Sequence, residues 1–258
     1  EQGVKLVEAI PAFHEEVQIN TTDKCGFKAA IKAAKKADVV VMVLGEYGFQ
    51  SGEGRSRTKL GLPGFQQELL EAVYKVNPNI VLVLMNGRPL VLNWAEAHLP
   101  AILETWHLGT QSGNAIAEVL YGDYNPSGKL PMSFPRSVGQ LPLYYNYKST
   151  GRPGADGTDA GSVFWSHYGD EKNTPLYPFG YGLSYTTFEY SNIRLSSNTL
   201  DLESSITASV TVSNTGKVKG KEVVQMYIKD HFASTTRPVR ELKGFELLSI
   251  EPGASVDV

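Results

Sequence analysis

The chain of 258 residues is poor in several features that mark particular classes of protein. It contains one cysteine, Cys25, which excludes an internal disulfide and a thiolate metal cluster, and leaves the redox compartment open. Its 24 basic and 27 acidic residues give a net charge of −3, and without a basic run we expect no nucleic-acid partner. No apolar stretch approaches the roughly 20 residues that span a bilayer, and the first residues lack the pattern of a signal peptide. The sequence therefore predicts no membrane partner.

Motifs for metal, nucleotide and acyl-transfer chemistry are also missing. The five histidines show no metal-ligand spacing, and we interpret each as structural or exposed: His14, His98, His107, His167 and His231. Gly180-Tyr181-Gly182 and Gly52-Glu53-Gly54 carry only part of a dinucleotide fingerprint, without its third glycine. There is no G-x-S-x-G nucleophile elbow. The sequence therefore predicts no metal site and no cofactor.

What the first half of the chain does contain is an alternation of short apolar runs and helical patterns. Continuous apolar runs predict buried strands at 38–44, 79–85 and 101–105. Apolar residues at helical spacing predict helices at 25–37, 65–76, 89–97 and 111–120. This alternation predicts an α/β domain over residues 1–140, with a mostly parallel sheet and helices on both faces. We interpret residues 1–22 as an entry segment, and a turn-rich segment with a short strand near 130–134 closes the domain.

The second half changes in composition and then in period. Residues 141–186 are a connector rich in glycine, proline and aromatic rings, whose density favours packing against the domains over a sugar-binding platform. From residue 187 the period is two, which predicts strands at 188–195, 206–214, 222–229 and 241–249 and a turn at Asn214-Thr215-Gly216. This pattern predicts an antiparallel β-sandwich over 187–258. Because seven-stranded sandwiches take around 100 residues, we expect an incomplete one, with an exposed edge open to association.

The stretch Gly45–Gln66, between the first apolar run and the next helix, is the strongest candidate for a functional loop. It is rich in glycine and longer than the about 2–6 residues of most strand-to-helix connections. In open α/β sheets, ligands bind beyond the carboxyl ends of strands, where this loop lies. In Ser51-Gly52-Glu53-Gly54 two glycines leave the carboxyl group unobstructed, so Glu53 is a candidate proton donor. The alternative is a solvated carboxylate paired with Arg55 or Arg57.

Seven segments read, in order, A-D-V-V-V-M-V-L-G-E, S-G-E-G-R-S-R-T-K-L-G-L-P-G-F-Q, V-L-M-N-G-R-P-L, A-I-L-E-T-W-H-L-G, Y-G-D-Y-N-P-S-G-K-L-P-M-S-F-P, Y-P-F-G-Y-G-L-S-Y-T-T-F and R-P-V-R-E-L-K-G-F-E. Together they resemble the C-terminal part of family 3 glycoside hydrolases, in particular periplasmic bacterial β-glucosidases. The resemblance implies an α/β domain with the general acid/base on a loop, followed by a fibronectin type III-like domain, truncated in this chain. It also implies an N-terminal (β/α)8 barrel, absent from this chain, that supplies an aspartate nucleophile.

On this resemblance Glu53 is the catalytic acid/base and Arg57 contacts or orients the substrate, while Ser56 stands where related sequences often carry aspartate. Because a nearby cation lowers the pKa of an acid, we expect Arg57 to turn towards another carboxylate, such as Glu46, or towards substrate. Retaining glycosidases need two carboxyl groups, and the resemblance places only the acid/base in this chain.

The resemblance thus implies the C-terminal part of a retaining β-glucosidase that acts on a β-glucoside or oligosaccharide in the periplasm or outside the cell. The isolated chain is predicted to be inactive. Hydrolysis of β-xylosides or α-arabinofuranosides remains open, because the missing barrel forms most of the sugar pocket. The alternative is a non-catalytic carbohydrate-binding or scaffolding module.

Overall fold

The computed structural model describes residues 24–153, 164–201 and 203–258, and the predicted entry segment 1–22 lies outside them. The chain divides into two compact units, which are described separately. The first, here called the α/β unit, spans 1–112, 133–143 and 153–177. The second, here called the β unit, spans 113–132, 144–152 and 178–258. The predicted connector 141–186 is therefore shared between the two units, and the domain bounds at 140 and 186 stay a prediction.

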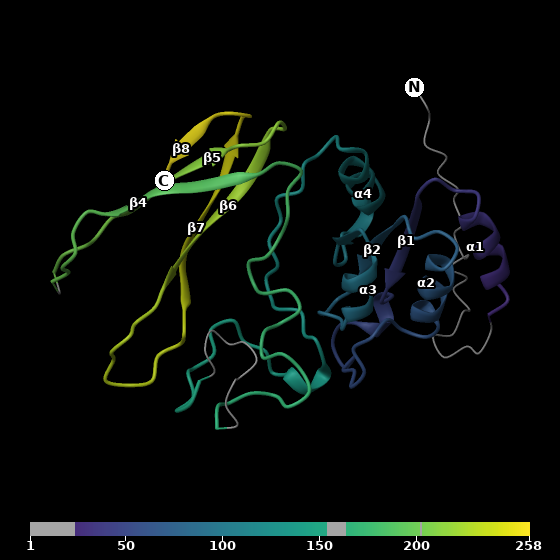
Figure 1. The fold of residues 1–258 in the computed structure, drawn as a ribbon, viewed down its shortest axis with the longest axis horizontal. Coiled ribbons are helices and arrows are strands. Elements are labelled where there is room, and N and C mark those ends of the chain that lie inside the picture. The colour runs from purple at the N-terminus through teal and green to yellow at the C-terminus, as the bar shows by residue number, and fades with distance from the viewer. Residues whose placement is uncertain (1–23, 154–163, 202) are drawn as a thin grey trace. The chain divides into compact units, whose positions relative to one another are not determined.

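The sheet of the α/β unit consists of three parallel strands in the order β1-β2-β3. Figure 1 labels β1 and β2 beside the helices of this half of the chain. The strands are β1 (Val40–Gly45), β2 (Ile80–Met85) and β3 (Ala101–Glu104). The central strand is the most deeply buried, with Leu82, Val83 and Leu84 each 0% exposed. An apolar run without alternation is what a strand covered on both faces requires. The predicted parallel sheet is therefore confirmed.

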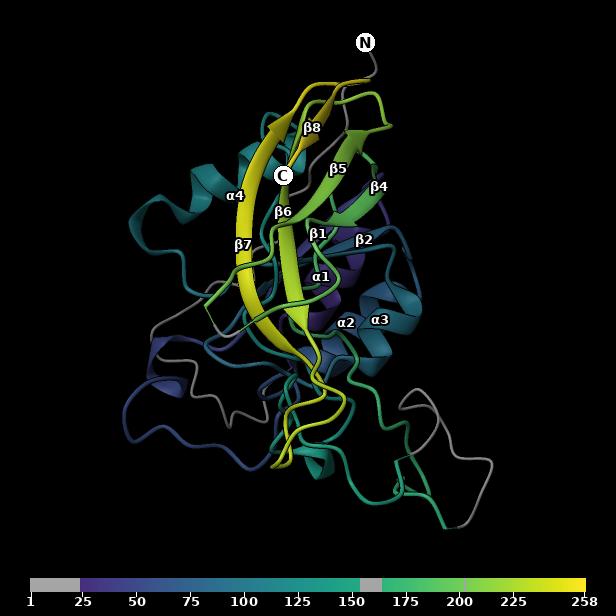
Figure 2. The same cartoon turned by 90° about the vertical axis from the view of Figure 1, so that its left-hand side faces the viewer.

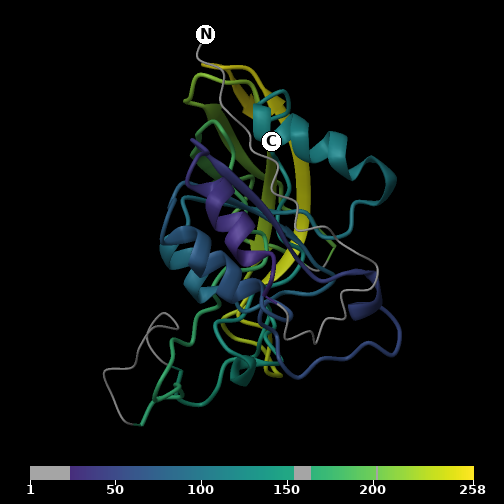
Figure 3. The ribbon, with the colours of Figure 1, turned by 90° about the vertical axis from the view of Figure 1, so that its right-hand side faces the viewer.

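Helices form at all four predicted places, but the first and last residue of each differ from the predicted ones. They are α1 (Phe27–Ala34), α2 (Gln66–Tyr74), α3 (Asn93–His98) and α4 (Ser112–Tyr121). Figure 3 shows α1 beside α2, which in turn contacts β1. Asn77, just after α2, donates through Nδ2 to the oxygens of Ala34 and Ala37, at 3.0 and 2.8 Å. These bonds satisfy carbonyls at the end of α1 that have no partner within the helix.

Two predictions within the α/β half are wrong in detail. Residues 89–92 are not helical, and the N–H of Val91 donates to the oxygen of Leu60, far away in the sequence, at 2.7 Å. Segment 130–134 is not a strand either. Its backbone bonds are isolated exchanges of Leu130 with 180–181 and of Phe134 with 176–177. Prolines at 131 and 135 have no N–H to donate, so no ladder forms.

The β unit contains two antiparallel sheets, as the period-two pattern predicts. One has the order β4-β5-β8, from β4 (Phe188–Leu195), β5 (Ala208–Asn214) and β8 (Ser255–Asp257). The other pairs β6 (Gly220–Ile228) with β7 (Glu241–Ile250), the long curved pair in Figure 2. Buried side chains from both sheets form one core: Val212, Val224, Leu248 and Ile250. The three-residue β8 was not predicted, because it is too short and polar to show a period.

Asn214 organises the predicted turn between β5 and β6. Its side-chain oxygen accepts the hydroxyl of Thr186 at 2.6 Å and the N–H of Gly216 at 3.1 Å. Its amide nitrogen donates to the oxygens of Val218 and Ile250 at 2.9 and 3.0 Å. Asn214 is 1% exposed, and all its polar capacity is used inside the protein.

The expected packing of the connector's aromatic residues holds for only some of them. Seven of the ten are exposed: Tyr144, Tyr147, Phe164, Trp165, Tyr168, Tyr181 and Tyr185. In the β unit the ring of Tyr145 stacks on that of Phe179 at 4.1 Å between centroids. In the α/β unit Tyr177 packs edge-on against Phe134, which is 1% exposed. These rings contribute buried apolar area to both units.

Candidate functional site

Polar residues gather where the three parallel strands of the α/β unit end. Glu46 follows β1, Asn86 follows β2, and Glu104 is the last residue of β3. The register pairs Gly45 with Met85 and Leu84 with Glu104, so these strand ends are neighbours at one edge. That edge is where α/β sheets place ligands.

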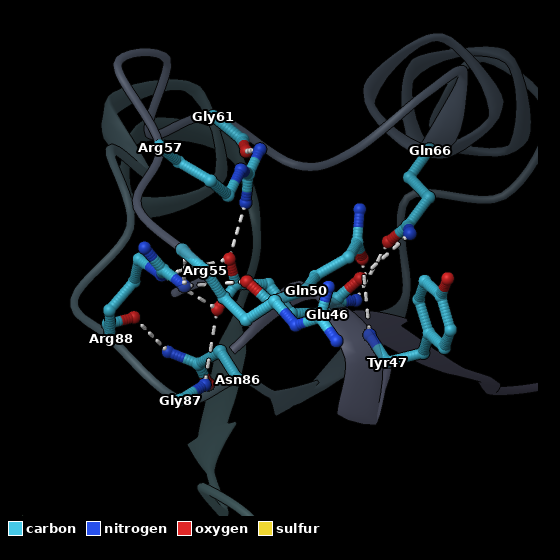
Figure 4. A network of polar contacts seen from close by, with 11 residues as sticks. Glu46, Tyr47, Gln50, Arg55, Arg57, Gly61, Gln66, Asn86, Gly87 and Arg88 are labelled. Carbon is cyan, nitrogen blue, oxygen red and sulfur yellow. Dashed lines mark hydrogen bonds and ion pairs between the residues drawn. The ribbon is translucent and has the colours of Figure 1, made fainter. Parts of the chain in front are cut away.

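Glu46 is the charged centre of this edge. Its side chain is 0% exposed and accepts from Arg57 Nη1 at 2.5 Å and from Arg88 Nε at 3.1 Å (Figure 4). The N–H of Gly87 donates to its second oxygen at 3.2 Å. Two guanidinium groups and a backbone donor therefore surround one buried carboxylate, which satisfies a charge that would be costly if left alone. The expectation that Arg57 turns towards Glu46 is confirmed.

The two arginines continue from Glu46 to the backbone of the loop. Arg57 Nη2 donates to the oxygen of Gly61 at 3.2 Å. Arg88 Nη2 donates to the oxygens of Gln50 and Arg55 at 2.5 and 2.7 Å. Arg88 thereby ties together both ends of segment 50–55. The loop is exposed to solvent but is attached to the sheet by charged hydrogen bonds.

The first residue of the loop is fixed by α2. The Gln66 side chain both accepts from the N–H of Gly45 at 2.7 Å and donates to its oxygen at 2.8 Å. Gly45 has φ +139°, and a Cβ at this position would lie 1.8 Å from the oxygen of Met85. Only glycine allows this close approach between the ends of β1 and β2.

Glu53 lies at the tip of the loop, in a turn that the N–H of Arg55 closes on the oxygen of Gly52 at 3.1 Å. Gly54 follows with φ +68°, a conformation that favours glycine. The Glu53 side chain is exposed and has no hydrogen bond or ion pair with any residue that the structure describes. The alternative ion pairs do not form, since Arg57 binds Glu46 and Arg55 lies 5.7 Å from the centroid of the Phe49 ring.

An open hollow of about 610 Å³ lies against this turn. Its lining includes Gly54, Arg57 and the ring of Phe49, together with Lys59 and Pro63. The hollow thus combines an aromatic surface with cationic hydrogen-bond donors and reaches Gly54, the residue after Glu53. Such a mixture suits a ligand with hydroxyl groups and apolar faces.

Glu104 has a distinct environment at the end of β3. Burial raises its pKa to about 7, against the opposing effects of hydrogen bonds from the Trp106 backbone and the Asn86 side chain. Oε1 accepts the N–H of Trp106 at 2.9 Å, which holds Trp106 at φ +50°. Among the described residues, neither Glu104 Oε2 nor Asn86 Oδ1 has a hydrogen-bond partner, although both atoms are buried.

The segments after the three strands meet at Gly87. A Cβ on Gly87 would lie 1.8 Å from Ser51 Oγ and 3.3 Å from His107 Nε2. Ser51 belongs to the loop with Glu53, and His107 follows Trp106. The three strand ends are therefore packed into one assembly at this edge.

Four residues of this assembly were not predicted as functional: Gln66, Asn86, Arg88 and Glu104. Two of them, Asn86 and Glu104, directly follow or end an apolar strand run, and that position was the available signal. Within the described ranges no cluster of three His, Cys, Asp or Glu side chains could hold a metal ion. No described helix has the length and apolar character needed to cross a membrane.

Comparison with known families agrees with this architecture. The model of the glycosyl hydrolase family 3 C-terminal domain matches residues 3–185, and that of the fibronectin type III-like domain matches residues 222–258. The chain belongs to glycosyl hydrolase family 3, of which it carries the C-terminal domain.

Similar proteins share most of this chain. It is 51% identical to a periplasmic beta-glucosidase of Salmonella typhimurium, over 96% of this chain and 32% of the relative. A beta-xylosidase of Formosa agariphila is 45% identical over 95% of this chain and 34% of the relative. The crystal structure of beta-glucosidase from Listeria innocua in complex with glucose matches with a TM-score of 0.87 at 40% identity, over 93% of this chain and 33% of that one. The chain thus spans about a third of the length of these relatives.

Proposed function

We propose that this chain supplies the general acid/base, Glu53, of a retaining β-glucosidase that removes terminal β-D-glucosyl residues. The main support for the proposal is the difference between the stem of the loop and its tip. Its stem is fixed by Glu46 and Arg88, while the Glu53 carboxyl group at its tip has no partner among the described residues. A group that must transfer a proton needs a fixed position and a free carboxyl group.

The reaction requires a second carboxyl group about 5–5.5 Å from the acid/base. In this proposal an aspartate of the N-terminal (β/α)8 barrel attacks the anomeric carbon while Glu53 protonates the leaving oxygen. Glu53 then removes a proton from the water that hydrolyses the glycosyl-enzyme intermediate. The chain by itself is consequently expected to be inactive on aryl β-glucosides.

Arg57 is the proposed substrate contact. Its Nη1 and Nη2 each donate within the protein, but its side chain is 19% exposed and lines the hollow beside Gly54. A guanidinium group has five N–H donors, so others remain for a substrate hydroxyl. Arg57 thus links the hollow to the buried Glu46.

The names of two relatives support the proposed location and substrate. One relative is named a periplasmic beta-glucosidase and another a beta-xylosidase. We propose a periplasmic or secreted enzyme with β-glucosides as substrates. β-Xylosides are the second class to assay.

The proposal is tested by Glu53→Ala in the complete enzyme. Loss of general acid catalysis typically lowers rates by about 10²–10⁴-fold, and the effect is largest where the leaving group is poor. We expect kcat to fall far more on an unactivated disaccharide than on an activated aryl glucoside. Glu68→Ala is the matched control, since Glu68 is an exposed carboxylate of the same unit, paired with Lys24. Unchanged hydrolysis of the disaccharide by Glu53→Ala would favour a carbohydrate-binding or scaffolding module instead.

A further inference from the structure

Two buried oxygens at the ends of neighbouring strands have no donor among the described residues. They are Asn86 Oδ1, after β2, and Glu104 Oε2, at the end of β3. Asn86 is 0% exposed, and its Nδ2 donates to the oxygen of Arg88 at 2.7 Å. Leaving a buried acceptor without a partner typically costs about 1–3 kcal/mol. A hydrogen-bond donor between these two acceptors would remove this cost.

A proton on the carboxyl group is the donor that fits. Both oxygens expose less than 1 Å² to a water-sized probe, so solvent does not reach them. The Asn86 side chain interacts with the Glu104 carboxyl group, and its hydrogen bond to the ionised form lowers the pKa less than burial raises it. Protonation turns Oε2 into an O–H donor, removes a charge from a buried site, and leaves Oε1 free to accept from Trp106.

The charged groups at this edge leave the Glu104 carboxyl group without a cationic partner. Glu46 after β1 is paired with Arg57 and Arg88, so both guanidinium groups are engaged by another carboxylate. His107, on the segment after Glu104, lies beside Gly87. The effects on Glu104 are burial and hydrogen bonds, with burial the largest, and these raise its pKa to about 7.

We propose that Glu104 is a positioning residue that works in its protonated form: it donates to Asn86, accepts from Trp106, and so joins the ends of β2 and β3. The joined ends support the loop that carries Glu53, because Ser51 of that loop packs against Gly87, beside which His107 also lies. The Gly87 N–H also donates to Glu46, which holds the loop through its two arginines. The identity of that loop as the acid/base loop rests on the proposed function.

The test is amide hydrogen exchange on this chain at pH 5.5 and pH 8.5, corrected for the intrinsic pH dependence of exchange. A pKa that falls from about 7 to 4.5 on opening makes opening about thirty-fold more frequent at pH 8.5. We expect this increase in peptides that cover residues 86–88 and 47–57. Strand β5, in the β unit, is the internal control and should not change.

Two substitutions separate the protonated form from other roles. Glu104→Gln mimics the protonated acid, since its amide donates to Asn86 while its oxygen accepts from Trp106, and should abolish the pH dependence and keep protection at pH 8.5. Glu104→Leu keeps the volume and loses both hydrogen bonds, and should exchange rapidly at both pH values. Equal wild-type protection at the two pH values, or Glu104→Gln as poorly protected as Glu104→Leu, would overturn the proposal.

A kinetic comparison in the complete enzyme distinguishes positioning from general structural support. A displaced acid harms poor leaving groups most, so Glu104→Leu should lower kcat at least tenfold more on an unactivated disaccharide than on an activated aryl glucoside, and Glu104→Gln should restore it. An equal loss on both substrates would refute a positioning role. Exchange needs no substrate, so its result is independent of whether Glu53 is the acid/base, which Glu53→Ala tests separately.

Discussion

The strand-end edge of the α/β unit and the β4-β5-β8 sheet of the β unit use polar side chains in opposite ways. At the edge, Glu46 has a fully buried side chain and holds two guanidinium groups. In the sheet, apart from Asn214 at the end of β5, polar contacts are exposed, such as Ser213 Oγ to Ser255 Oγ at 2.7 Å. Ion pairs of the β unit include Lys219–Glu251, with side chains 60% and 62% exposed.

This difference separates polar groups that position from polar groups that cover a surface. Burying charges costs free energy of desolvation, and good geometry must offset that cost. Exposed pairs contribute about 0–1 kcal/mol and constrain little. A buried charge network at the carboxyl end of a parallel sheet is therefore informative about function, whereas exposed hydroxyl contacts on a sandwich are not. Four predictions test this contrast, from the largest expected effect to the smallest.

Removal of the buried carboxylate should have the largest effect. Glu46→Ala leaves Arg57 and Arg88 without their anion and should destabilise the α/β unit by about 3–5 kcal/mol. Denaturant unfolding followed by tryptophan fluorescence reports this unit alone, because all three tryptophans belong to it. Glu68→Ala, which breaks an exposed pair with Lys24, should cost less than about 1 kcal/mol. Equal losses of stability in the two variants would contradict the proposed difference between buried and exposed charge pairs.

The second prediction concerns the pH dependence of the same unit. The folded-state pKa of Glu104 is raised from 4.5 to about 7, so the folded state binds this proton more tightly than the unfolded state. Its contribution is fully present below pH 4.5 and is lost as pH rises to 7, a change of about 3 kcal/mol. The difference in stability between wild type and Glu104→Gln should therefore shift against wild type over this window. A difference that is constant with pH would contradict the assignment.

The third prediction asks what a buried neutral group contributes in the β unit. Asn214→Ala leaves four groups without their hydrogen-bond partner, among them the oxygens of Val218 and Ile250. We expect a loss of about 2 kcal/mol, smaller than for Glu46 because no charge is left unpaired. NMR-detected unfolding of β5 and β6 measures it. A loss above that of Glu46→Ala would reverse the proposed order.

The smallest effect is expected at an exposed hydroxyl contact. Ser213→Ala removes one side of the contact with Ser255, and both partners can bond water instead. The β unit should lose about 0.5 kcal/mol or less, as is usual for surface substitutions. The same NMR-detected unfolding provides the comparison, and a loss above about 1.5 kcal/mol would show that this sheet depends on its hydroxyl contacts.

The sequence predicted those parts of the fold whose signal is local. β1, β2 and β3 are continuous apolar runs, and the sequence of β4 to β7 has a period of two, so both sets of strands have a local signal. The strand predicted near Leu130–Phe134 does not form. Pro131 and Pro135 have no N–H to donate to a neighbouring strand, and this outweighs the apolar character of the segment. The exposed position of Glu53 followed from the glycines on either side of it.

The contacts of the site were less predictable because they depend on register. Arg88 lies 42 residues after Glu46, and only the parallel pairing of β1 with β2 brings the two together. Glu104 reads in the sequence as an ordinary carboxylate at the end of an apolar run. Its raised pKa arises from burial, which leaves no local pattern in the sequence.

The most direct test of the central claim is azide rescue of Glu53→Ala in the complete enzyme. Azide attacks the glycosyl-enzyme intermediate without needing a general base, so it bypasses the step that the missing carboxylate would perform. On an activated aryl β-glucoside, azide should accelerate the variant, and NMR should identify the product as a β-glycosyl azide. Turnover that azide does not change, with free sugar as the sole product, would contradict the assignment of Glu53 as the acid/base.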